Sequence, residues 1–342
     1  MNIGFTYNVR HMEPDINNPQ YIKEAEFDTK ETIDGITQAI ESLGHTVYKI
    51  EADENAYEHF KNLKNKIDLV FNFAEGIYGA DREAQIPAML EMLQIPYTGP
   101  KPLSYALGLH KAKAKEIMAH YRIPTPRWTV IRSLENVPKN GVDFFPAIVK
   151  PMREGSSKGI GAENLVYNQE ELQKIAEQTI KEFNQEVLVE EYLEGREFTV
   201  GILGNPARVL PIVEVTFDEL PKGMPKFDHY EAKWVYDSTK EKSDPLICPA
   251  VLEENLKIKI EDVCLRAFKA LEMSDWSRLD VRLDKNEAPN IIEINCPPGI
   301  IPDPKENSRF PRAARVAGMD FAKMIETVIK SACSRYKLEY KI

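Results

Sequence analysis

The sequence predicts an α/β protein made of several lobes, the first of which is an open, mostly parallel sheet. The chain has 342 residues, more than one small hydrophobic core usually organises, so two or three lobes are expected. In its N-terminal part, short apolar strands alternate with amphipathic helices, which is the pattern of an open α/β sheet. Further along, residues 276–299 read as two strands around a polar turn and predict a hairpin in a separate sheet.

Composition and charge exclude several classes of function. The net charge of −10 argues against a nucleic-acid partner, because such partners select basic surfaces. No apolar run approaches the about 18 residues of a membrane span, and the N-terminus lacks the basic and apolar regions of a signal peptide. The four cysteines are widely spaced, which fits a reducing compartment. We therefore expect a cytoplasmic protein with no nucleic-acid and no membrane partner.

The first lobe is predicted over residues 1–109. Its expected strands and helices, in chain order, occupy residues 2–6, 28–43, 46–50, 67–73 and 82–93. Gly44 follows the first helix at the position that favours a C-terminal cap. The continuous apolar run at 67–73 suits a parallel strand that is buried on both faces.

Polar residues cluster directly after that buried strand. Functional side chains of open α/β sheets gather beyond the carboxyl ends of the strands, so this segment is a candidate for substrate contacts. The candidate residues are Glu75, Asp81, Arg82 and Glu83. The alternative is a solvated loop and helix N-terminus without a functional role.

The second lobe, predicted over residues 110–186, is organised around a glycine-rich segment. The elements that precede this segment are a helix at 110–121 and strands at 128–131 and 145–150. Residues 155–161 then combine glycines with two serines, shortly after a strand that ends in Lys150. Such a loop exposes backbone N–H groups and can close over phosphate oxygens. It lacks the Gly-Lys-Ser/Thr ending of the common phosphate loop, so it is a different kind of phosphate-binding segment.

The third lobe is predicted over residues 187–342. Its expected strands lie at 186–190, 198–203 and 208–213, and its expected helices at 252–271 and 312–334. Residues 216–249 are polar and lack periodicity, and an unstructured loop of that length is usually functional. Lys233 lies within this loop.

In the hairpin at 276–299, apolar and polar residues alternate with the period of a strand. Ile292 and Ile294 are therefore expected to share one face. If the turn is centred between residues 286 and 287, Asp280 lies directly opposite Glu293.

Two carboxylates placed opposite each other, with Cβ atoms about 5 Å apart, repel unless a cation neutralises them. The same register places Arg278 opposite Asn295, whose amide oxygen lies on the same face. Asp280, Glu293 and Asn295 together predict a site for a divalent cation with oxygen ligands. The alternative is a solvated hairpin with scattered charges.

In order and spacing, segments from about residue 67 to residue 320 resemble the ATP-grasp superfamily and, within it, the D-alanine–D-alanine ligase family. The matching segments are Lys111; Val149-Lys150-Pro151 with Arg153-Glu-Gly-Ser-Ser; Val189-Glu-Glu-Tyr-Leu-Glu-Gly-Arg-Glu-Phe-Thr-Val; Tyr230-Glu-Ala-Lys; Cys248-Pro-Ala; Arg278-Leu-Asp; and Glu293-Ile-Asn with Pro298-Gly. The resemblance implies an ATP-grasp fold behind an N-terminal open parallel α/β domain. Residues 110–186 would then form the central lid subdomain, and residues 187–342 the C-terminal subdomain with the metal and substrate site.

The resemblance also implies roles in binding ATP. Lys111 and Lys150 would contact its phosphates, and Lys233 would meet the γ-phosphate. Ser156 and Ser157 would lie on the loop that closes over them. The residues implied at the adenine and ribose are Glu190, Glu191, Tyr192, Leu193 and Glu197.

The remaining implied roles concern the metal and the reaction. Asp280, Glu293 and Asn295 would hold Mg²⁺, with Mn²⁺ as an alternative, which agrees with the hairpin argument. The implied catalytic residues are Arg278, which would stabilise the oxyanion of a tetrahedral intermediate, together with Ser156 and the backbone of Gly299.

The implied activity is ATP-dependent joining of two amino-acid-like substrates through an acyl phosphate, with release of ADP and phosphate. Two alternatives are a small-molecule kinase on the same fold and a catalytically silent ATP-binding module. Arg278 favours the ligase, because a silent module has no use for an oxyanion-stabilising arginine. The family is commonly dimeric through its first domain, which implies a homodimer.

The amino-acid half of the sequence departs from the family pattern. Trp234 stands where the family has a tyrosine, and Glu26 lies near the family's first-loop glutamates without the accompanying glycines. Glu75 and Arg82 belong to a segment that replaces the family's His-Gly-x-x-Gly-Glu-Asp-Gly, and the serine expected after Pro298-Gly is missing. The substrate residues are therefore taken as Glu26, Glu75, Arg82 and Trp234. We expect a divergent member that makes D-alanyl-D-alanine poorly and prefers at least one other or larger substrate.

Overall fold

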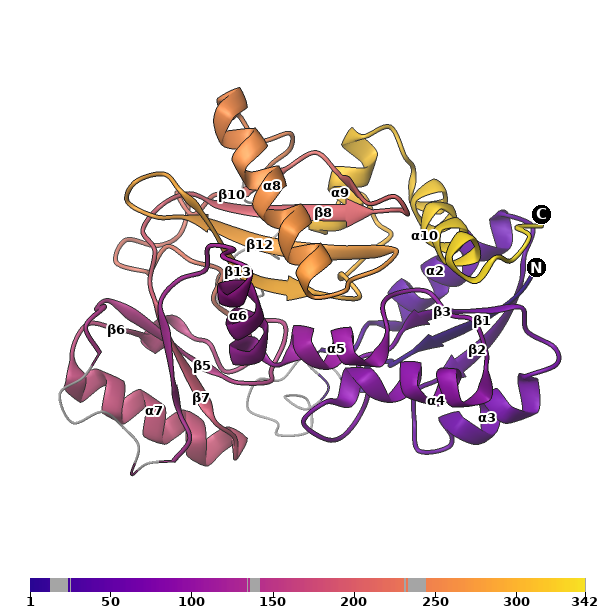
Figure 1. Ribbon diagram of the computed structural model, residues 1–342, viewed down its shortest axis with the longest axis horizontal. Helices are drawn as coiled ribbons and strands as arrows, with labels where there is room; N and C mark the ends of the chain where they lie inside the picture. Colours follow the sequence, from indigo (N-terminus) through magenta and orange to yellow (C-terminus); the bar gives the residue numbers. More distant parts are fainter. Residues whose placement is uncertain are drawn as a thin grey trace.

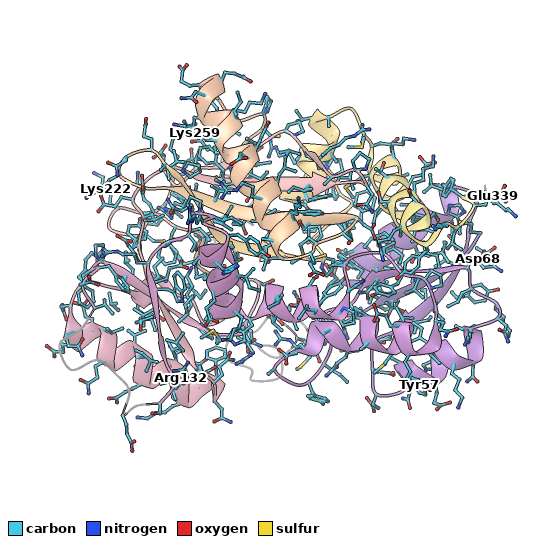
Figure 2. All side chains as sticks on the ribbon, in the orientation of Figure 1. Tyr57, Asp68, Arg132, Lys222, Lys259 and Glu339 are labelled. Carbon is cyan, nitrogen blue, oxygen red and sulfur yellow. The ribbon has the colours of Figure 1, made fainter. Side chains whose placement is uncertain are left out.

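Three sheets organise the chain in the computed structural model, which describes residues 1–12, 24, 26–133, 135, 142–230, 232 and 244–341 (Figure 1). Charged side chains such as Lys259 and Glu339 point outward from this framework (Figure 2). Within the described residues, no helix is both long and apolar enough to cross a bilayer.

The N-terminal sheet is parallel and is covered on both faces. Its strands β1 (Asn2–Tyr7), β2 (Thr46–Glu51) and β3 (Leu69–Phe73) lie in the order β2-β1-β3. Apolar residues of α2 (Lys30–Ser42) pack with Phe5 and Phe71, whereas those of α3 (Ala56–Leu63) and α4 (Gln85–Leu93) pack with Val70. All five residues of β3 are buried, as the apolar run predicts. The open parallel α/β sheet predicted for this lobe is confirmed.

The central sheet is antiparallel and follows two short helices, α5 (Pro102–Leu109) and α6 (Lys111–His120). Its strands, in the order β4-β7-β5-β6, are β4 (Trp128–Ile131), β7 (Val187–Glu191), β5 (Ala147–Pro151) and β6 (Leu165–Val166). Helix α7 (Gln169–Phe183) packs its apolar stripe against this sheet. β7 therefore lies in the central sheet, although the predicted lobe boundary at 186/187 falls just before it.

The third sheet is the largest and carries the predicted hairpin. Its main path runs β11-β10-β8-β12-β13, with β9 beside β8. The strands are β8 (Glu197–Leu203), β9 (Arg208–Val209), β10 (Val213–Val215), β11 (Leu246–Ile247), β12 (Trp276–Leu283) and β13 (Pro289–Asn295). The single strand predicted at 208–213 is wrong, because β9 and β10 are separate strands on different parts of β8.

Three helices accompany this sheet: α8 (Glu254–Ala270), α9 (Arg309–Val316) and α10 (Phe321–Tyr336). The single helix predicted at 312–334 is therefore wrong. Gly318 has a φ of +82° and ends the first helical segment. Asp320 then caps the second, because its side chain accepts a hydrogen bond from the backbone N–H of Lys323 at 2.7 Å.

The C-terminal helix returns to the N-terminal lobe. Figure 1 shows α10 beside α2, with both chain termini at that edge. Arg335 of α10 pairs with the buried Asp275 at 2.6 Å and donates to the backbone oxygens of Tyr97 and Gly99, each at 2.8 Å. The third sheet and the N-terminal sheet also share one hydrophobic core, in which Trp276 packs against Phe71. These contacts hold the two lobes together around the site.

Candidate active site

The hairpin of β12 and β13 places the predicted metal residues together. Asp280 pairs with Glu293, and Arg278 pairs with Asn295, so the predicted register is confirmed at these positions. A bulge after Asp280 shifts the register, and Val281 then lies opposite Ile291 instead of Ile292. The connection between the two strands is therefore one residue shorter than assumed, and the extra residue in the bulge restores the predicted pairing of Asp280 with Glu293.

The bulge also changes which isoleucine is in the core. Ile291 is fully buried in the hydrophobic core, whereas Ile292 is half-buried and faces a cavity together with Glu293. The expectation that Ile292 shares the core face of Ile294 is wrong, because a bulge places two consecutive residues on one side of the strand. Ile294 keeps its predicted place in the core.

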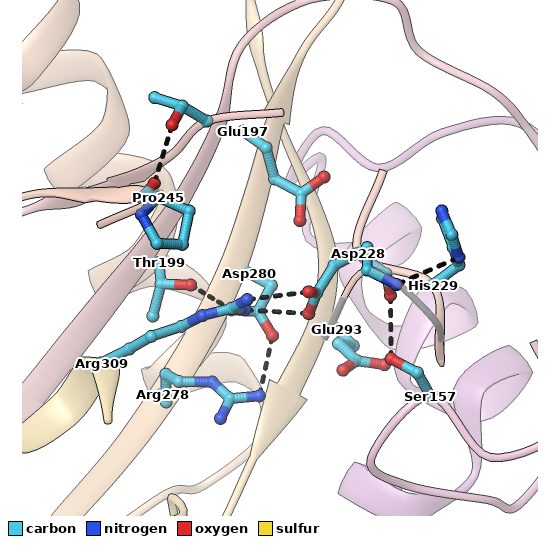
Figure 3. Close-up of polar contacts among 12 residues, drawn as sticks. Ser157, Glu197, Thr199, Asp228, His229, Pro245, Arg278, Asp280, Glu293 and Arg309 are labelled. Carbon is cyan, nitrogen blue, oxygen red and sulfur yellow. Dashed lines mark hydrogen bonds and ion pairs between the residues drawn. The ribbon is translucent and has the colours of Figure 1, made fainter. Parts of the chain in front are cut away.

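The oxygen-bearing side chains at this point converge (Figure 3). The carboxylate of Asp280 accepts hydrogen bonds from Thr199 Oγ1 at 2.7 Å, from Arg278 Nη2 at 3.0 Å and from Asn295 Nδ2 at 3.2 Å. Asn295 Nδ2 also reaches Glu293 Oε1 at 3.4 Å. Burial alone would raise the pKa of Asp280, but the charges of Arg278 and Arg309 hold it below its usual value. The carboxylate is therefore ionised at neutral pH.

The donor set fits a hard divalent cation. Two carboxylates and an amide side chain that can present its oxygen are the ligand types that Mg²⁺ and Mn²⁺ take. Among the described residues, no group of three or more His, Cys, Asp or Glu side chains forms a metal-binding cluster. A cation here would therefore depend on the mixed set of Asp280, Glu293 and Asn295.

A buried ion-pair cluster lies beside the hairpin. Glu190 of β7 accepts from Lys150 Nζ at 2.5 Å and pairs with Lys115 Nζ at 2.6 Å, and all three side chains are less than 9% exposed. Burial alone would raise the pKa of Glu190, but the two lysines lower it, so it is ionised. Lys115 Nζ also donates to Thr125 Oγ1 at 2.6 Å. The cluster fixes Lys150 at the end of its strand.

A small cavity of about 60 Å³ opens between the central and third sheets. Its lining combines apolar side chains with charged ones: Ile148, Lys150, Glu154, Ser157, Ile160, Glu190, Glu191, Tyr192, Leu193, Glu197, Phe227, Asp228, Asp280, Arg282, Ile292 and Glu293. Burial raises the pKa of Glu197 to about 7, although its partner Arg282, at 2.8 Å, acts to lower it. The apolar section of this slot suits a flat ring, and the lysine suits a phosphate.

A larger cavity of about 260 Å³ lies on the other side of the glycine-rich segment, toward the N-terminal lobe. The predicted residues that line it are Glu26, Glu75, Glu83, Lys111, Ser156, Arg278, Glu293, Asn295 and Gly299. A Cβ atom placed on Gly299 would meet nothing within 4 Å, so its backbone faces open space. Glu154 and Glu293 line both cavities, which therefore meet at the carboxylates of the hairpin.

The glycine-rich segment lies between the two cavities and is held by hydrogen bonds at its first and third residues. The N–H of Gly155 donates to Glu26 Oε1 at 2.5 Å, and Ser157 Oγ donates to the backbone oxygen of Asp228 at 2.8 Å. Ser156 and Ser157 have φ values of 51° and 60°, a left-handed conformation that non-glycine residues seldom adopt. Ser156 faces the larger cavity and Ser157 the smaller one.

This arrangement matches known proteins. Residues 117–330 match the family described as D-ala D-ala ligase C-terminus. The D-alanine–D-alanine ligase of Aquifex aeolicus is 36% identical over 86% of this chain and 92% of its own. A protein of uncharacterised function from Sinorhizobium fredii, y4sG, is 33% identical over 89% of this chain and 88% of its own.

The chain belongs to the D-alanine–D-alanine ligase family. The crystal structure of a D-alanine–D-alanine ligase from Bacillus anthracis complexed with ATP shares the fold, with a TM-score of 0.74 at 23% identity over 98% of this chain and 99% of that one. The predicted ATP-grasp ligase family and fold are thereby confirmed. The chain is an enzyme of the ligase class.

Two predicted residues of the family pattern cannot be placed. Lys233 and Trp234 lie outside the described residues. Glu191 lines the small cavity, but its carboxylate is held by Arg127 at 3.0 and 3.1 Å near the surface. The roles predicted for the individual ATP, metal and substrate residues stay predictions.

Arg82 is not among the residues that line the large cavity, and its predicted contact with substrate stays a prediction. Its guanidinium is largely buried and donates to Glu26 Oε2 at 2.5 Å and to the backbone oxygen of Arg153 at 3.0 Å. Burial alone would raise the pKa of Glu26, but Arg82, Lys158 and the N–H of Gly155 lower it. Arg82 therefore holds Glu26 ionised and against the glycine-rich segment. Glu26 and Glu75 line the cavity, and their substrate roles stay predictions.

A serine further along the chain does lie at this cavity, although the serine expected shortly after Pro298-Gly is missing from the sequence. Ser308 is almost fully buried, and its Oγ accepts the N–H of Ile301 at 2.9 Å. The prediction that the missing serine changes substrate use stays a prediction.

Sequence reasoning also missed two charged residues that the structure makes part of the site. Lys115 lies one helical turn after Lys111, and this spacing on α6 could have indicated a second lysine on the same face. Arg309 makes two hydrogen bonds to Asp228, at 2.8 and 2.9 Å (Figure 3). Arg309 and Asp228 lie 81 residues apart, and no local pattern links them.

Proposed function

We propose that this chain uses ATP to activate a carboxylate as an acyl phosphate and then joins it to an amine, both on amino-acid-like substrates. The observation that carries the proposal is the junction of the two cavities at Glu293 and Glu154. A nucleotide in the small cavity would direct its terminal phosphate toward this junction, where a carboxylate bound in the large cavity would also end. Phosphoryl transfer requires this adjacency, because it depends mainly on positioning and charge neutralisation.

Lysines would hold the phosphates. Lys150 lines the small cavity and Lys111 the large one, so they lie on the two sides of the junction. Burial lowers the pKa of Lys111, although the carboxylate of Glu293 acts to raise it. Asp280, Glu293 and Asn295 would hold Mg²⁺, or Mn²⁺ in its place. When bound, that ion neutralises phosphate charge during transfer.

The two steps balance without a covalent enzyme intermediate. A carboxylate oxygen of the first substrate takes the γ-phosphoryl group and ADP leaves. The deprotonated amine of the second substrate then bonds to the acyl carbon, the acyl–oxygen bond breaks and phosphate leaves. Arg278 would stabilise the oxyanion between these events. Its Nε is buried and lacks a hydrogen-bond partner within the described part of the chain, so a donor remains available.

D-Alanine is the first substrate to test, because the named relatives are D-alanine–D-alanine ligases. The sequence prediction that this chain uses it poorly rested on Trp234 and on a missing serine. Ser308 lines the large cavity, so the weight of the second reason depends on whether this serine reaches a substrate. The homodimer, the three lobe boundaries and the cytoplasmic location likewise remain predictions.

The test is a phosphate-release screen of amino-acid pairs in both chiralities with Mg²⁺ and ATP, with products identified by mass spectrometry. A ligase gives ADP, phosphate and a product with a new amide bond. A small-molecule kinase instead gives a stable phosphorylated product without an amide. ATP binding without turnover for any pair would favour the silent module and contradict the proposal.

A further inference from the structure

The N-terminal lobe supplies a row of carboxylates to the large cavity. Asp28 lies at the start of α2, Glu75 follows β3, and Glu83 lies in the 3₁₀ turn η1 (Arg82–Ala84). All three line the cavity, and we call them the carboxylate wall. Glu26 lines the cavity as well, but it is already engaged by Arg82 and by the N–H of Gly155.

The described residues compensate the carboxylate wall only in part, because Arg10 acts on Asp28 and Arg82 acts on Glu75 and Glu83 without forming a direct ion pair with them. Among the described residues, none forms a hydrogen bond or ion pair with the carboxylate of Glu75 or Glu83. The nearby cations are directed elsewhere: Arg82 binds Glu26 and the backbone of Arg153, and Lys111 Nζ donates to the backbone oxygen of Glu154. Three carboxyl groups with this little compensation are costly in a partly buried site unless a ligand supplies positive charge.

The pKa values of the three wall residues are raised, in keeping with this shortage of positive charge. Burial and then the charge of Glu83 raise the pKa of Glu75 well above its usual value. Burial raises the pKa of Glu83 to about 8, and that of Asp28 to about 7 despite the nearby Arg10. The cavity therefore holds protons at neutral pH that a cationic ligand would replace.

The wall lines the same cavity as the predicted catalytic residues. That cavity contains Arg278, Gly299 and Ser156, so a substrate that reaches them also meets the wall. The buried Ser308 lines it as well and suits a substrate carboxylate, whereas Arg309 is already paired with Asp228.

Two amino acids with uncharged side chains do not supply enough positive charge to balance the carboxylate wall. One substrate keeps its ammonium group through the reaction. The other substrate's amine is the nucleophile and must lose its proton before it attacks. A single ammonium then faces the three carboxyl groups of the wall, whereas Glu26 is already paired with Arg82.

We propose that one substrate is an amino acid with a cationic side chain, an ammonium or a guanidinium, which the carboxylate wall binds. This inference rests on the proposed ligase function and names a substrate class for the same site. The wall makes Glu75 and Glu83 specificity-determining residues.

Binding measurements with matched ligands test this without requiring turnover. The full-length protein with Mg²⁺ and ADP is titrated calorimetrically with arginine against citrulline and with lysine against norleucine, in both chiralities. Each pair has similar size and differs in the side-chain charge. We expect the cationic member of at least one pair to bind about 30-fold more tightly or better, because leaving a buried charge unpaired costs at least that factor.

Substitutions then assign the preference to the wall. Glu75→Gln and Glu83→Gln keep the shape and remove the charge, so each is expected to reduce the preference for the cationic ligand at least about tenfold. Asp81→Asn is the matched control, because Asp81 is exposed on the same segment and does not line the cavity. Loss of the like-charge contact should leave the variants folded. If a variant fails to fold, the wild-type ligand pairs still decide the question.

Equal or weaker binding of arginine and lysine relative to their neutral partners, in both chiralities, would overturn the inference. So would an undiminished preference in folded Glu75→Gln and Glu83→Gln variants. Efficient ligation of neutral pairs together with that result would leave the proposed function standing. A clear cationic preference without any amide product would instead count against the proposed function alone.

Discussion

The two cavities that meet at Glu293 differ in how their charges are balanced. Around the small cavity, the carboxylates other than the shared Glu293 have basic partners: Glu190 has two lysines, Glu197 has Arg282 and Asp280 has Arg278. In the large cavity, Glu75 and Glu83 have no such partner within the described residues. A region whose charges are paired in advance is rigid and suits a ligand that does not vary. A region with unpaired charges leaves the balance to its ligand, so the specificity of this enzyme should lie there.

The largest expected effect is a loss of turnover when the predicted metal residues at the small cavity are substituted. Asp280→Asn and Glu293→Gln should each lower kcat by at least about 10³-fold, because phosphoryl transfer depends on charge neutralisation at this point. Both variants should stay folded, since removing one carboxylate relieves a like-charge contact. Steady-state phosphate release at saturating Mg²⁺ measures the loss. Glu287→Gln, on the exposed turn of the same hairpin, is the control. Wild-type rates in either site variant would refute the metal assignment.

The next effect concerns stability and not turnover. Glu190→Gln leaves two buried lysines without a counter-charge, so we expect the free energy of unfolding to fall by about 3–5 kcal/mol. The control is the adjacent Glu191→Gln, whose ion pair with Arg127 lies near the surface and contributes little to stability. Urea unfolding of both variants at one pH provides the comparison. Equal losses for the two would show that Glu190 is not the electrostatic centre of the cluster.

The same contrast explains how much the sequence could predict. The nucleotide side is built from consecutive strand residues whose alternation predicts which side chains share a face, so Asp280, Glu293 and Asn295 were identified together. The bulge at Ile292 was not visible, because one inserted residue leaves the hydrophobic composition unchanged. The connection is one residue shorter than assumed and the bulge adds one residue to β13, so Asp280 still pairs with Glu293 as predicted.

The amino-acid side is assembled from segments that are distant in sequence. The pair of Arg82 and Glu26 joins residues 56 positions apart, and the pair of Arg309 and Asp228 joins residues 81 apart. No periodicity encodes such contacts, so the sequence alone does not show that Arg82 pairs with Glu26. Ser308 and Gly299 line the same cavity, and no local pattern links them.

A smaller effect tests whether the glycine-rich segment belongs to both cavities. Residues 155–161 should exchange amide hydrogens faster without nucleotide than with Mg²⁺ and ATP, because bound phosphates add anchoring contacts. Glu26→Gln should raise exchange at Gly155 about tenfold in the nucleotide-free protein, since it weakens a charge-assisted hydrogen bond. Glu163→Gln, an exposed position just beyond the segment, is the control. Equal protection with and without nucleotide would argue against a closing role.

The smallest expected effect isolates one member of the carboxylate wall through its pH dependence. Burial raises the pKa of Asp28 to about 7, although Arg10 acts to lower it, whereas an unfolded aspartate titrates near 3.9. The folded protein therefore binds this proton more tightly than the unfolded chain. Its stabilising contribution is complete below about pH 4 and is lost as the pH rises through about 7.

The melting temperature of the ligand-free protein should accordingly contain a component that declines between about pH 4 and pH 7. Asp28→Asn cannot ionise, so the decline should become shallower over that interval, by about 2–4 °C for each 1 kcal/mol that ionisation of Asp28 costs the folded protein. Glu83, whose pKa burial raises to about 8, keeps a residual slope at higher pH in the variant. Asp81→Asn should reproduce the wild-type curve. If Asp28→Asn also reproduces it, the carboxyl of Asp28 is already balanced in the free protein, and the wall reduces to Glu75 and Glu83.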